Sequence, residues 1–174
     1  MSDKFHDAGH GKLIDAVLSN DMKALSNALS QEDVNGADID GWTALHIAAL
    51  EENAEATQLL LSQPTISVNA KNRWKSTPLM IAAGSGNLAI VDLILRHPRT
   101  QIDLQAEYYG RTALIEAAVK GHKSVVKALV SNGANVNVTD KTGRSSALIE
   151  AIKNGHINVA TCLLRSGLVD FSER

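Results

Sequence analysis

The chain has 174 residues, a length that fits one domain or a short array of repeats, and its formal net charge is −2. The nearly balanced charge excludes an overall electrostatic bias towards nucleic acid. No apolar run approaches the roughly 18 residues needed to span a bilayer, and the polar N-terminal sequence lacks the apolar stretch of a standard signal peptide. The single cysteine, Cys162, cannot form an internal disulfide, which suits a reducing compartment. We therefore expect a cytoplasmic protein, with a nuclear location or secretion as an effector left open.

Residues 1–11 are polar and show no periodicity, so they are predicted to form a flexible lead-in. From residue 12 onward, one short pattern recurs along the chain. Its anchoring leucines follow one another at 32, 34, 35 and 34 residues, and they are Leu13, Leu45, Leu79, Leu114 and Leu148. A period near 33, with two apolar stripes in each unit, is typical of a helical solenoid.

The stretch 40–49, DGWTALHIAA, is the clearest copy of the pattern. It resembles the ankyrin repeat, which runs D-x-x-G-x-T-P-L-H-x-A-A-x-x-G-H, then V-x-x-L-L and G-A-x-V-N. The resemblance covers about residues 12–170 and implies an all-α solenoid of about five stacked helix-turn-helix repeats with short β-hairpin-like loops. Residues 12–174 are expected to form this single domain, with the first and last repeats as caps. The expected repeats span 12–39, 40–71, 72–106, 107–139 and 140–174.

The second repeat follows the family pattern closely. Thr43 is a natural N-cap, because its hydroxyl can accept hydrogen bonds from amides of the first helical turn. The resemblance implies a structural role for His46, whose ring would bind loop backbone between repeats. Glu52 replaces the glycine between the two helices, where a left-handed backbone would strain a non-glycine residue. We therefore predict that this turn is built differently. Lys75 replaces a hairpin glycine in the third repeat.

The later repeats differ from the pattern in their loops and at the end of the array. Thr77-Pro78 places an N-cap before a proline at the first helical position, where the missing amide is tolerated. One extra residue, Ser145 or Ser146, lengthens the last hairpin. The fifth repeat is predicted to be the C-terminal cap, with Phe171 packed against it. Its polar surface residues are expected to be Lys153, Asn154, Asn158 and Arg165.

Catalytic and metal-binding motifs are absent from the sequence. There is no nucleophile elbow, H-E-x-x-H, cysteine pair or phosphate-binding glycine loop. Glu116 and Glu150 could do acid-base work, but their equivalent positions in successive repeats favour a stacked polar row. His122 and His156 also occupy matching turn positions, which favours a structural role. We therefore assign no catalytic, metal-binding or cofactor-binding residue and expect no enzyme activity.

The resemblance also implies a binding surface. Partners of ankyrin arrays usually contact the hairpin loops, here called fingers, and the exposed side of the first helices. The matching positions form a set that contains both tryptophans and both tyrosines. We predict partner contacts for Asp40, Trp42, Glu51, Arg73, Trp74, Ser76, Tyr108, Tyr109, Arg111, Lys120, Lys141, Arg144 and Lys153. The other matching positions are Ile39, Leu50, Gly84, Ser85, Val119, Thr142 and Asn154.

The composition of this set suggests what kind of partner it would bind. Trp, Tyr and Arg are the residue types that dominate interface energetics. The second repeat contributes Asp40 and Glu51, whereas the later repeats contribute only basic charges. We therefore expect a protein partner with an acidic and apolar contact segment, and a chain that is monomeric alone. The alternative, that the large rings merely shield neighbouring loops, stays open.

These observations favour a non-catalytic protein-protein interaction module, such as an adaptor, an inhibitor or an effector-type scaffold. The alternative from another class is an enzyme or metal-dependent catalyst that uses His46, His122 or Glu116. A third hypothesis is weak nucleic-acid binding through the basic C-terminal part of the face. Neither alternative is supported by a motif.

Overall fold

The computed structural model of the chain describes residues 11–170. Within this range the backbone forms ten helices, no extended strand, and two isolated β-bridges, Ala37–Thr43 and Thr139–Ser146. The predicted lead-in, apart from Gly11, and Phe171 lie outside the described residues. The helices are α1 (Lys12–Leu18), α2 (Met22–Leu29), α3 (Ala44–Leu50), α4 (Ala54–Leu61), α5 (Pro78–Ser85), α6 (Leu88–Leu95), α7 (Ala113–Lys120), α8 (Lys123–Ser131), α9 (Ala147–Lys153) and α10 (Ile157–Arg165).

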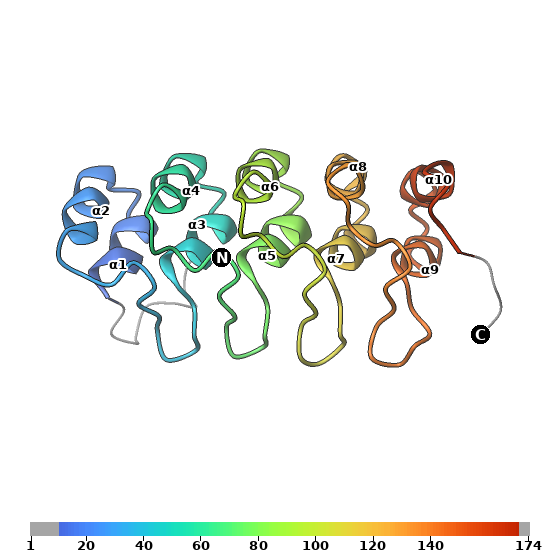
Figure 1. Ribbon diagram of the computed structural model, residues 1–174, viewed down its shortest axis with the longest axis horizontal. Helices are drawn as coiled ribbons and strands as arrows, with labels where there is room; N and C mark the ends of the chain where they lie inside the picture. The colour runs from blue at the N-terminus through green and yellow to red at the C-terminus, as the bar shows by residue number, and fades with distance from the viewer. Residues whose placement is uncertain (1–10, 171–174) are drawn as a thin grey trace.

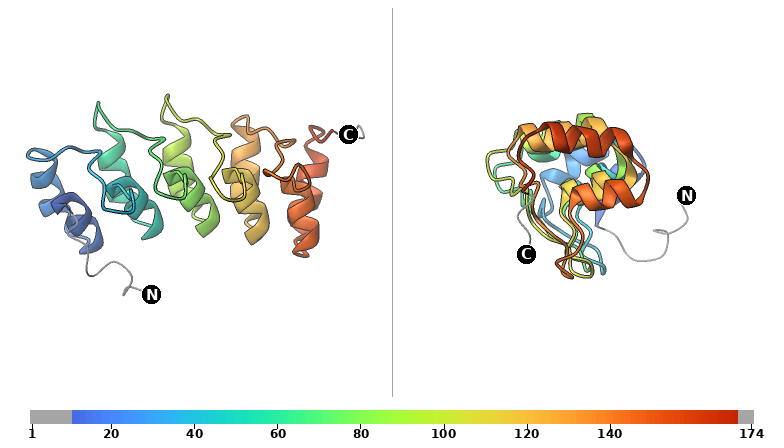
Figure 2. Two further views of the ribbon diagram at one scale, coloured as in Figure 1. Left: turned by 90° about the horizontal axis from the view of Figure 1, so that it is seen from below. Right: turned by 90° about the vertical axis from the view of Figure 1, so that its right-hand side faces the viewer.

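The helices are arranged as five antiparallel pairs that stack along one axis. The first helices of the pairs form one row and the second helices form another, while the fingers project together on one side (Figure 1). Viewed along the long axis, the repeats superimpose almost completely (Figure 2). The predicted all-α solenoid is therefore confirmed. None of the helices in the described range is long and apolar enough to cross a membrane.

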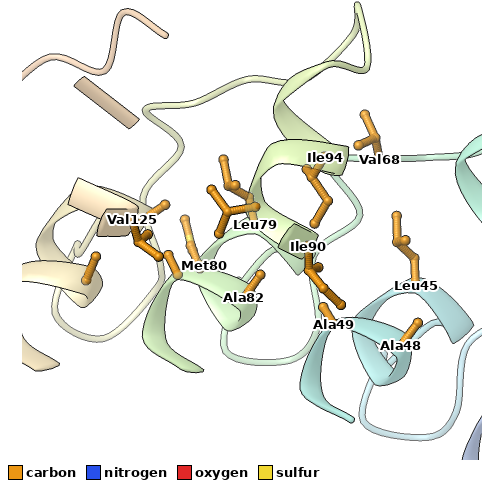
Figure 3. Packing of buried hydrophobic residues seen from close by; sticks show 14 of the residues in the cluster. Leu45, Ala48, Ala49, Val68, Leu79, Met80, Ala82, Ile90, Ile94 and Val125 are labelled. Atoms are coloured by element: carbon orange, nitrogen blue, oxygen red, sulfur yellow. The ribbon is translucent and has the colours of Figure 1, made fainter. Parts of the chain in front are cut away.

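The hydrophobic core is distributed between neighbouring repeats, as a repeat array requires. Ala48, Ala49 and Ala82 are fully buried, and their small side chains allow adjacent helices to approach closely. Ile90 and Ile94 of α6 fill the space above the first helices (Figure 3). The same apolar unit recurs along the array, so burial in each repeat depends on the repeat that follows it.

Side-chain caps fix where the helices begin. In four repeats a hydroxyl side chain accepts a hydrogen bond from the backbone amide three residues later, and these N-caps are Thr43, Thr77, Thr112 and Ser146. Asp21, Asn53 and Asn87 cap the second helices of the first three repeats. His122 and His156 precede the last two second helices without a side-chain cap bond.

The prediction that the turn at Glu52 is built differently from the other interhelix turns is wrong. This residue adopts the left-handed conformation (φ 57°), as do Asn20 (φ 54°) and the finger residue Lys75 (φ 57°). The left-handed backbone costs roughly 1–2 kcal/mol in a non-glycine residue. Hydrogen bonds to the side chains favour it here: Asn87 Nδ2 donates to Glu52 Oε2 (3.3 Å), and Asn53 Nδ2 donates to Asn20 Oδ1 (2.7 Å). The turn geometry is therefore conserved along the array although the residue changes.

A ladder of amide and carboxylate side chains joins the long loops of successive repeats. Asn35 donates to Thr65 O (2.9 Å) and accepts from Ser67 N (2.7 Å). Equivalent side chains, each bonded to the loop of the next repeat, are Asn69, Asp103 and Asn137. Each side chain satisfies backbone groups that neither helix can reach, so the loops are held at the spacing of the helices.

The fifth repeat differs from the polar cap predicted for it. Lys153, Asn154, Asn158 and Arg165 are exposed as expected. However, α9, α10 and the turn after them also expose five large apolar side chains, namely Ile149, Ile152, Ile157, Leu164 and Leu168. The sequence pattern did not reveal this, because apolar residues at these positions also suit a repeat that another repeat covers.

Candidate partner-binding face

Each finger is a short loop closed by one backbone hydrogen bond at its base. In the first finger Asp38 N donates to Trp42 O (2.9 Å), and Asp38 Oδ1 accepts from the amides of Asp40 and Trp42. Asn72 and Asp140 organise the second and fourth fingers in the same way, because short polar side chains favour such turns. The sequence therefore specifies the finger shape locally.

Neighbouring fingers are also bonded to one another. Arg73 N donates to Asp40 O (2.8 Å), Glu107 N donates to Trp74 O (2.8 Å), and Lys141 N donates to Tyr109 O (3.0 Å). These three bonds place equivalent finger residues side by side on one face of the array (Figure 2). The fingers consequently form a connected surface with fixed spacing.

Three of the four predicted aromatic residues are exposed on this surface. Tyr108 and Tyr109 on the third finger are 71% and 67% exposed, and Trp74 on the second finger is 37% exposed. Trp42 departs from the prediction, because only 9% of it is exposed. Its ring packs edge-on against Trp74, at 6.1 Å between centroids, and against His46 at 5.8 Å. Trp42 thus supports Trp74 from beneath and offers little surface to a partner.

Several predicted charged contacts are used within the chain. Arg73 Nη1 lies 2.6 Å from Asp40 Oδ1. Arg111 was expected to offer its guanidinium to a partner, but its side chain is only 27% exposed. It faces Glu116 Oε1 (3.7 Å) and Glu150 Oε2 (3.8 Å). The structure therefore corrects the role of Arg111, which joins the carboxylates of two successive first helices. These carboxylates form part of the polar row predicted from their spacing.

Glu150 is the centre of a small hydrogen-bonded network. A short hydrogen bond from the Ser145 hydroxyl holds the pKa of this carboxyl below its usual range. Partial burial raises the pKa, whereas the nearby charges of Lys153 and Arg111 lower it further. Lys153 Nζ also donates to Ser145 Oγ (2.9 Å). Lys153 is therefore engaged by its own repeat, although its side chain is 58% exposed. The extra finger residue, Ser145, is buried and organises this network.

Three predicted basic residues, Lys120, Lys141 and Arg144, are exposed and form no ion pair within the described part of the chain. The acidic Glu51 is also exposed on the same side, at the end of α3. However, Lys75 lies 3.8 Å from Glu107 on the third finger. The charge difference along the face is therefore smaller than the sequence positions alone indicated.

A shallow groove of about 290 Å³ lies between the fingers and the first helices. Its lining combines apolar groups with one acid and one base, and it consists of Leu50, Ser76, Met80, Ile81, Gly84, Ser85, Ala106, Glu116 and Lys120. Sequence reasoning had placed Leu50, Ser76, Gly84, Ser85 and Lys120 on this side. It missed Met80 and Ile81, because their apolar helix positions looked like ordinary core. The sequence signal for this groove was Met80, which stands at the position that His46 occupies in the preceding repeat.

The histidines considered for catalysis have structural contacts. His46 is fully buried; its Nδ1 lies 3.2 Å from Thr43 N, and its Nε2 lies 3.0 Å from Ser76 O. Nδ1 therefore accepts and Nε2 donates, so both ring nitrogens are engaged. Burial lowers the pKa of His46 from 6.5 to about 4 and keeps the ring neutral. The predicted role of His46 in binding loop backbone is confirmed.

His122 and His156 likewise join successive repeats. His122 Nε2 lies 3.0 Å from Gly84 O, and His156 Nε2 lies 2.9 Å from Val119 O. Their matching positions reflect this shared structural role, as predicted. Between residues 11 and 170, no three or more histidine, cysteine, aspartate or glutamate side chains form a group that could hold a metal ion.

Comparison with known proteins agrees with this geometry. The family model for ankyrin repeats (three copies) matches residues 13–106, 64–140 and 98–173. The SMC5-SMC6 complex localization factor protein 1 of Homo sapiens is 34% identical over 106 residues, which are 61% of this chain and 10% of that protein. The ankyrin repeat and SAM domain-containing protein 6 of Mus musculus is 40% identical over 76 residues, 44% of this chain and 8% of the relative.

A third relative, the neurogenic locus notch homolog protein 1 of Xenopus laevis, is 32% identical over 111 residues. These are 64% of this chain and 4% of that protein. The matched segments thus span a tenth or less of the length of these relatives. The similarity lies in the repeats, and the family model matches nearly every described residue. The chain belongs to the ankyrin-repeat family.

Proposed function

We propose that this chain is a non-catalytic module that binds another protein through its fingers and first helices. Ankyrin repeats generally serve as protein-protein interaction modules, and the relatives named above are consistent with that role. The observation that carries the proposal is the juxtaposition of Trp74, Tyr108 and Tyr109, exposed on adjacent fingers, with the groove behind them. The proposed anchors are these three rings.

The chemistry of the face indicates the kind of segment that it would bind. Each exposed ring combines a large apolar area with a polar atom and few rotatable bonds, which limits the entropy lost on binding. The groove offers the half-buried Ile81 to an apolar side chain of the partner, with the buried Met80 beneath it. Lys120, Lys141 and Arg144 would attract acidic groups on the same segment. We therefore propose an acidic and apolar segment of an intracellular protein as the partner.

The alternative functions have less support. Catalysis by His46 would need a ring nitrogen that a substrate can reach, and both of its nitrogens are engaged in a buried site. Binding of nucleic acid would need an uninterrupted basic surface. On this face Glu107, Glu116 and Glu150 lie among the basic residues, and each is close to one of them.

Affinity capture from the native lysate, followed by a binding titration with the captured protein, tests this proposal. Tyr108→Ala and Tyr109→Ala should each weaken binding. Where the ring is a hot spot, the loss should be about 2 kcal/mol or more, which is roughly a thirtyfold rise in Kd. Trp74→Ala should weaken binding as well. Its loss of the Trp42 contact will also lower stability, so the tyrosine variants give the cleaner measurement.

Lys127→Ala is the control, because Lys127 is exposed on α8 and away from the fingers. It should bind like the unaltered chain. The melting temperature of each variant shows whether the fold is intact. Normal binding by both tyrosine variants, together with normal stability, would place the interface elsewhere on the molecule.

A further inference from the structure

The row of second helices contains a groove between α8 and α10 that the proposed partner-binding face does not use. These neighbouring helices pack against each other on the side of the array away from the fingers (Figure 1). The groove has a volume of about 400 Å³, and its lining runs from Lys123 to Ser131 on α8 and from Asn158 to Ser166 along α10. Since a helix rises by about 1.5 Å per residue, the groove is about 12 Å long.

The groove carries three positive charges and no negative charge. Lys123, Lys127 and Arg165 are exposed and line it, and no aspartate or glutamate is among its described lining residues. None of the three cations forms an ion pair with the described part of the chain, whereas four basic residues on the finger side each face a carboxylate. The charges in the groove are therefore available to an anion from outside the chain.

The matching positions of earlier repeats have a different chemistry, so this groove is not a general feature of the repeat. Lys127 stands five residues after the N-cap of its helix, where the second and third repeats have Gln58 and Asp92. Cys162 lines the groove at the position where the third repeat has the larger Leu93. The junction of α8 and α10 thus combines a smaller side chain with basic residues in place of a neutral or acidic one.

Neutral hydrogen-bond donors complete the lining. Asn158 and Thr161 are exposed in the groove, and their side chains form no hydrogen bond with the described part of the chain. Arg165 has a planar fork of donors that suits the oxygens of a phosphate group, and the lysines act as point charges. A phosphate group has three strong acceptor oxygens, so it can use charged and neutral donors together. This set of donors favours phosphate over carboxylate.

We infer that the groove between α8 and α10 binds a compound or headgroup that carries at least two phosphate groups. A single phosphate would leave some of the cations, which are spread over about 12 Å, without an anionic partner. A nucleic-acid strand would need the basic surface to continue onto the neighbouring helix, but α6 carries Asp92 at the position of Lys127. Because the groove lies apart from the fingers, it can be occupied while they hold a protein partner.

Protection of Cys162 from the neutral reagent N-ethylmaleimide tests this inference, because Cys162 lines the groove and is the single cysteine of the chain. Inorganic triphosphate is the probe, added at constant ionic strength. At ten times its Kd it should slow the alkylation of Cys162 by about tenfold. Citrate, which has three carboxylates, is the control for charge alone and should protect much less. Titration calorimetry with the same two anions gives their Kd values without use of the thiol.

Lys123→Ala and Arg165→Ala should each raise the Kd for triphosphate by about tenfold or more, because each removes a charged donor. Arg96→Ala is the matched control, since Arg96 is exposed and stands nine residues after its N-cap, as Arg165 does. It should bind triphosphate normally. Vesicles with and without a lipid that carries two headgroup phosphates distinguish the sources: cosedimentation with the former alone identifies a membrane lipid, and its absence identifies a free compound.

Four results would overturn the inference. The first is a chain that shows neither calorimetric binding of triphosphate nor protection of Cys162. The second is equal binding of citrate and triphosphate, which would mean that the groove responds to charge alone. The third is triphosphate binding that both Lys123→Ala and Arg165→Ala leave unchanged. The fourth is stronger protection by a single-stranded oligonucleotide than by triphosphate, which would indicate a nucleic-acid site.

Discussion

At the scale of single residues, His46 shows how a motif position acquires its role. Its ring nitrogens bind Thr43 in its own repeat and Ser76 O at the base of the next finger. The neutral ring can make both contacts, since one nitrogen accepts while the other donates. A protonated ring has two donors, so the contact with Thr43 N would be lost. The buried site therefore favours the neutral form on hydrogen-bonding grounds as well as by burial.

We expect the stability of the chain to decrease as the pH falls from 7 to 4, with His46 as one cause. The pKa of this histidine is about 4 in the folded chain, against 6.5 as its ordinary value. Below pH 6.5 the unfolded chain therefore binds a proton that the folded chain excludes. The free energy of unfolding should fall by about 3 kcal/mol across this range through His46 alone. Urea unfolding at a series of pH values measures the effect.

His46→Gln is the comparison, because glutamine can still donate to Ser76 O but does not titrate. This variant will be less stable at pH 7, yet it should lose less stability than the unaltered chain as the pH falls. The carboxylates titrate in both proteins, so their contribution cancels in the difference. If the two pH profiles run parallel, the protonation of His46 does not oppose folding.

At the scale of the structural element, the interhelix turn has two solutions within one chain. In the second and third repeats an amide side chain, Asn53 or Asn87, caps the second helix and bonds to the side chain of the left-handed Asn20 or Glu52 in the preceding repeat. In the last two, a histidine replaces the amide. The rings of His122 and His156 then lie directly over Gly86 and Gly121. At Gly86 and Gly121 the missing side chain therefore allows both the positive φ of the turn and the close packing of the histidine ring.

Gly121→Ala should be more destabilising than Gly155→Ala. Both glycines have positive φ, at 78° and 74°, so both alanines incur a backbone cost of roughly 1–2 kcal/mol. A Cβ at position 121 would lie 2.6 Å from His156 Nδ1, whereas a Cβ at position 155 would meet nothing within 4 Å. The clash should add about 1–3 kcal/mol. Thermal or urea unfolding of the two variants measures the difference.

The double variant Gly121→Asn/His156→Asn separates the two causes. It reproduces the Asn20 and Asn53 pair of the first two repeats, so it should recover part of the stability lost in Gly121→Ala. Equal destabilisation by Gly121→Ala and Gly155→Ala would mean that the histidine ring moves away without cost. The close contact would then have no energetic role.

At the scale of the whole molecule, stability depends on the contact of each repeat with its neighbours. The helices α3, α5 and α7 are covered on both sides, whereas α9 and α10 have one side exposed. We expect backbone amides of α5 and α7 to exchange with solvent more slowly than those of α10, by about tenfold or more. Hydrogen exchange followed by mass spectrometry measures this difference.

The first repeat provides an internal comparison for that experiment. It is also terminal, but its outer side is polar and Asp21 caps α2 with two hydrogen bonds. Its amides should exchange faster than those of α5, because only one neighbour supports it. Uniform exchange along the chain would indicate that all five repeats unfold as one cooperative unit.

The sequence by itself determined the repeat architecture, because the information for a solenoid is local. The leucine spacing, the N-cap residues Thr43 and Thr77 and the matching positions of His122 and His156 each act within one repeat or between neighbours. The finger positions of Trp74, Tyr108 and Tyr109 could be predicted for the same reason. Each follows from its offset within the repeat.

The tertiary structure decided properties that depend on contacts between repeats. Both tryptophans lie on fingers, but Trp42 packs against Trp74 and the buried His46 and is 9% exposed, whereas Trp74 is 37% exposed. Arg111 faces two carboxylates that lie 5 and 39 positions away along the chain, so sequence distance could not reveal its partners. The exposure of Ile152 likewise depends on whether another repeat follows in space. Burial and ion pairing are properties of the stacked array, and a pattern within one repeat cannot encode them.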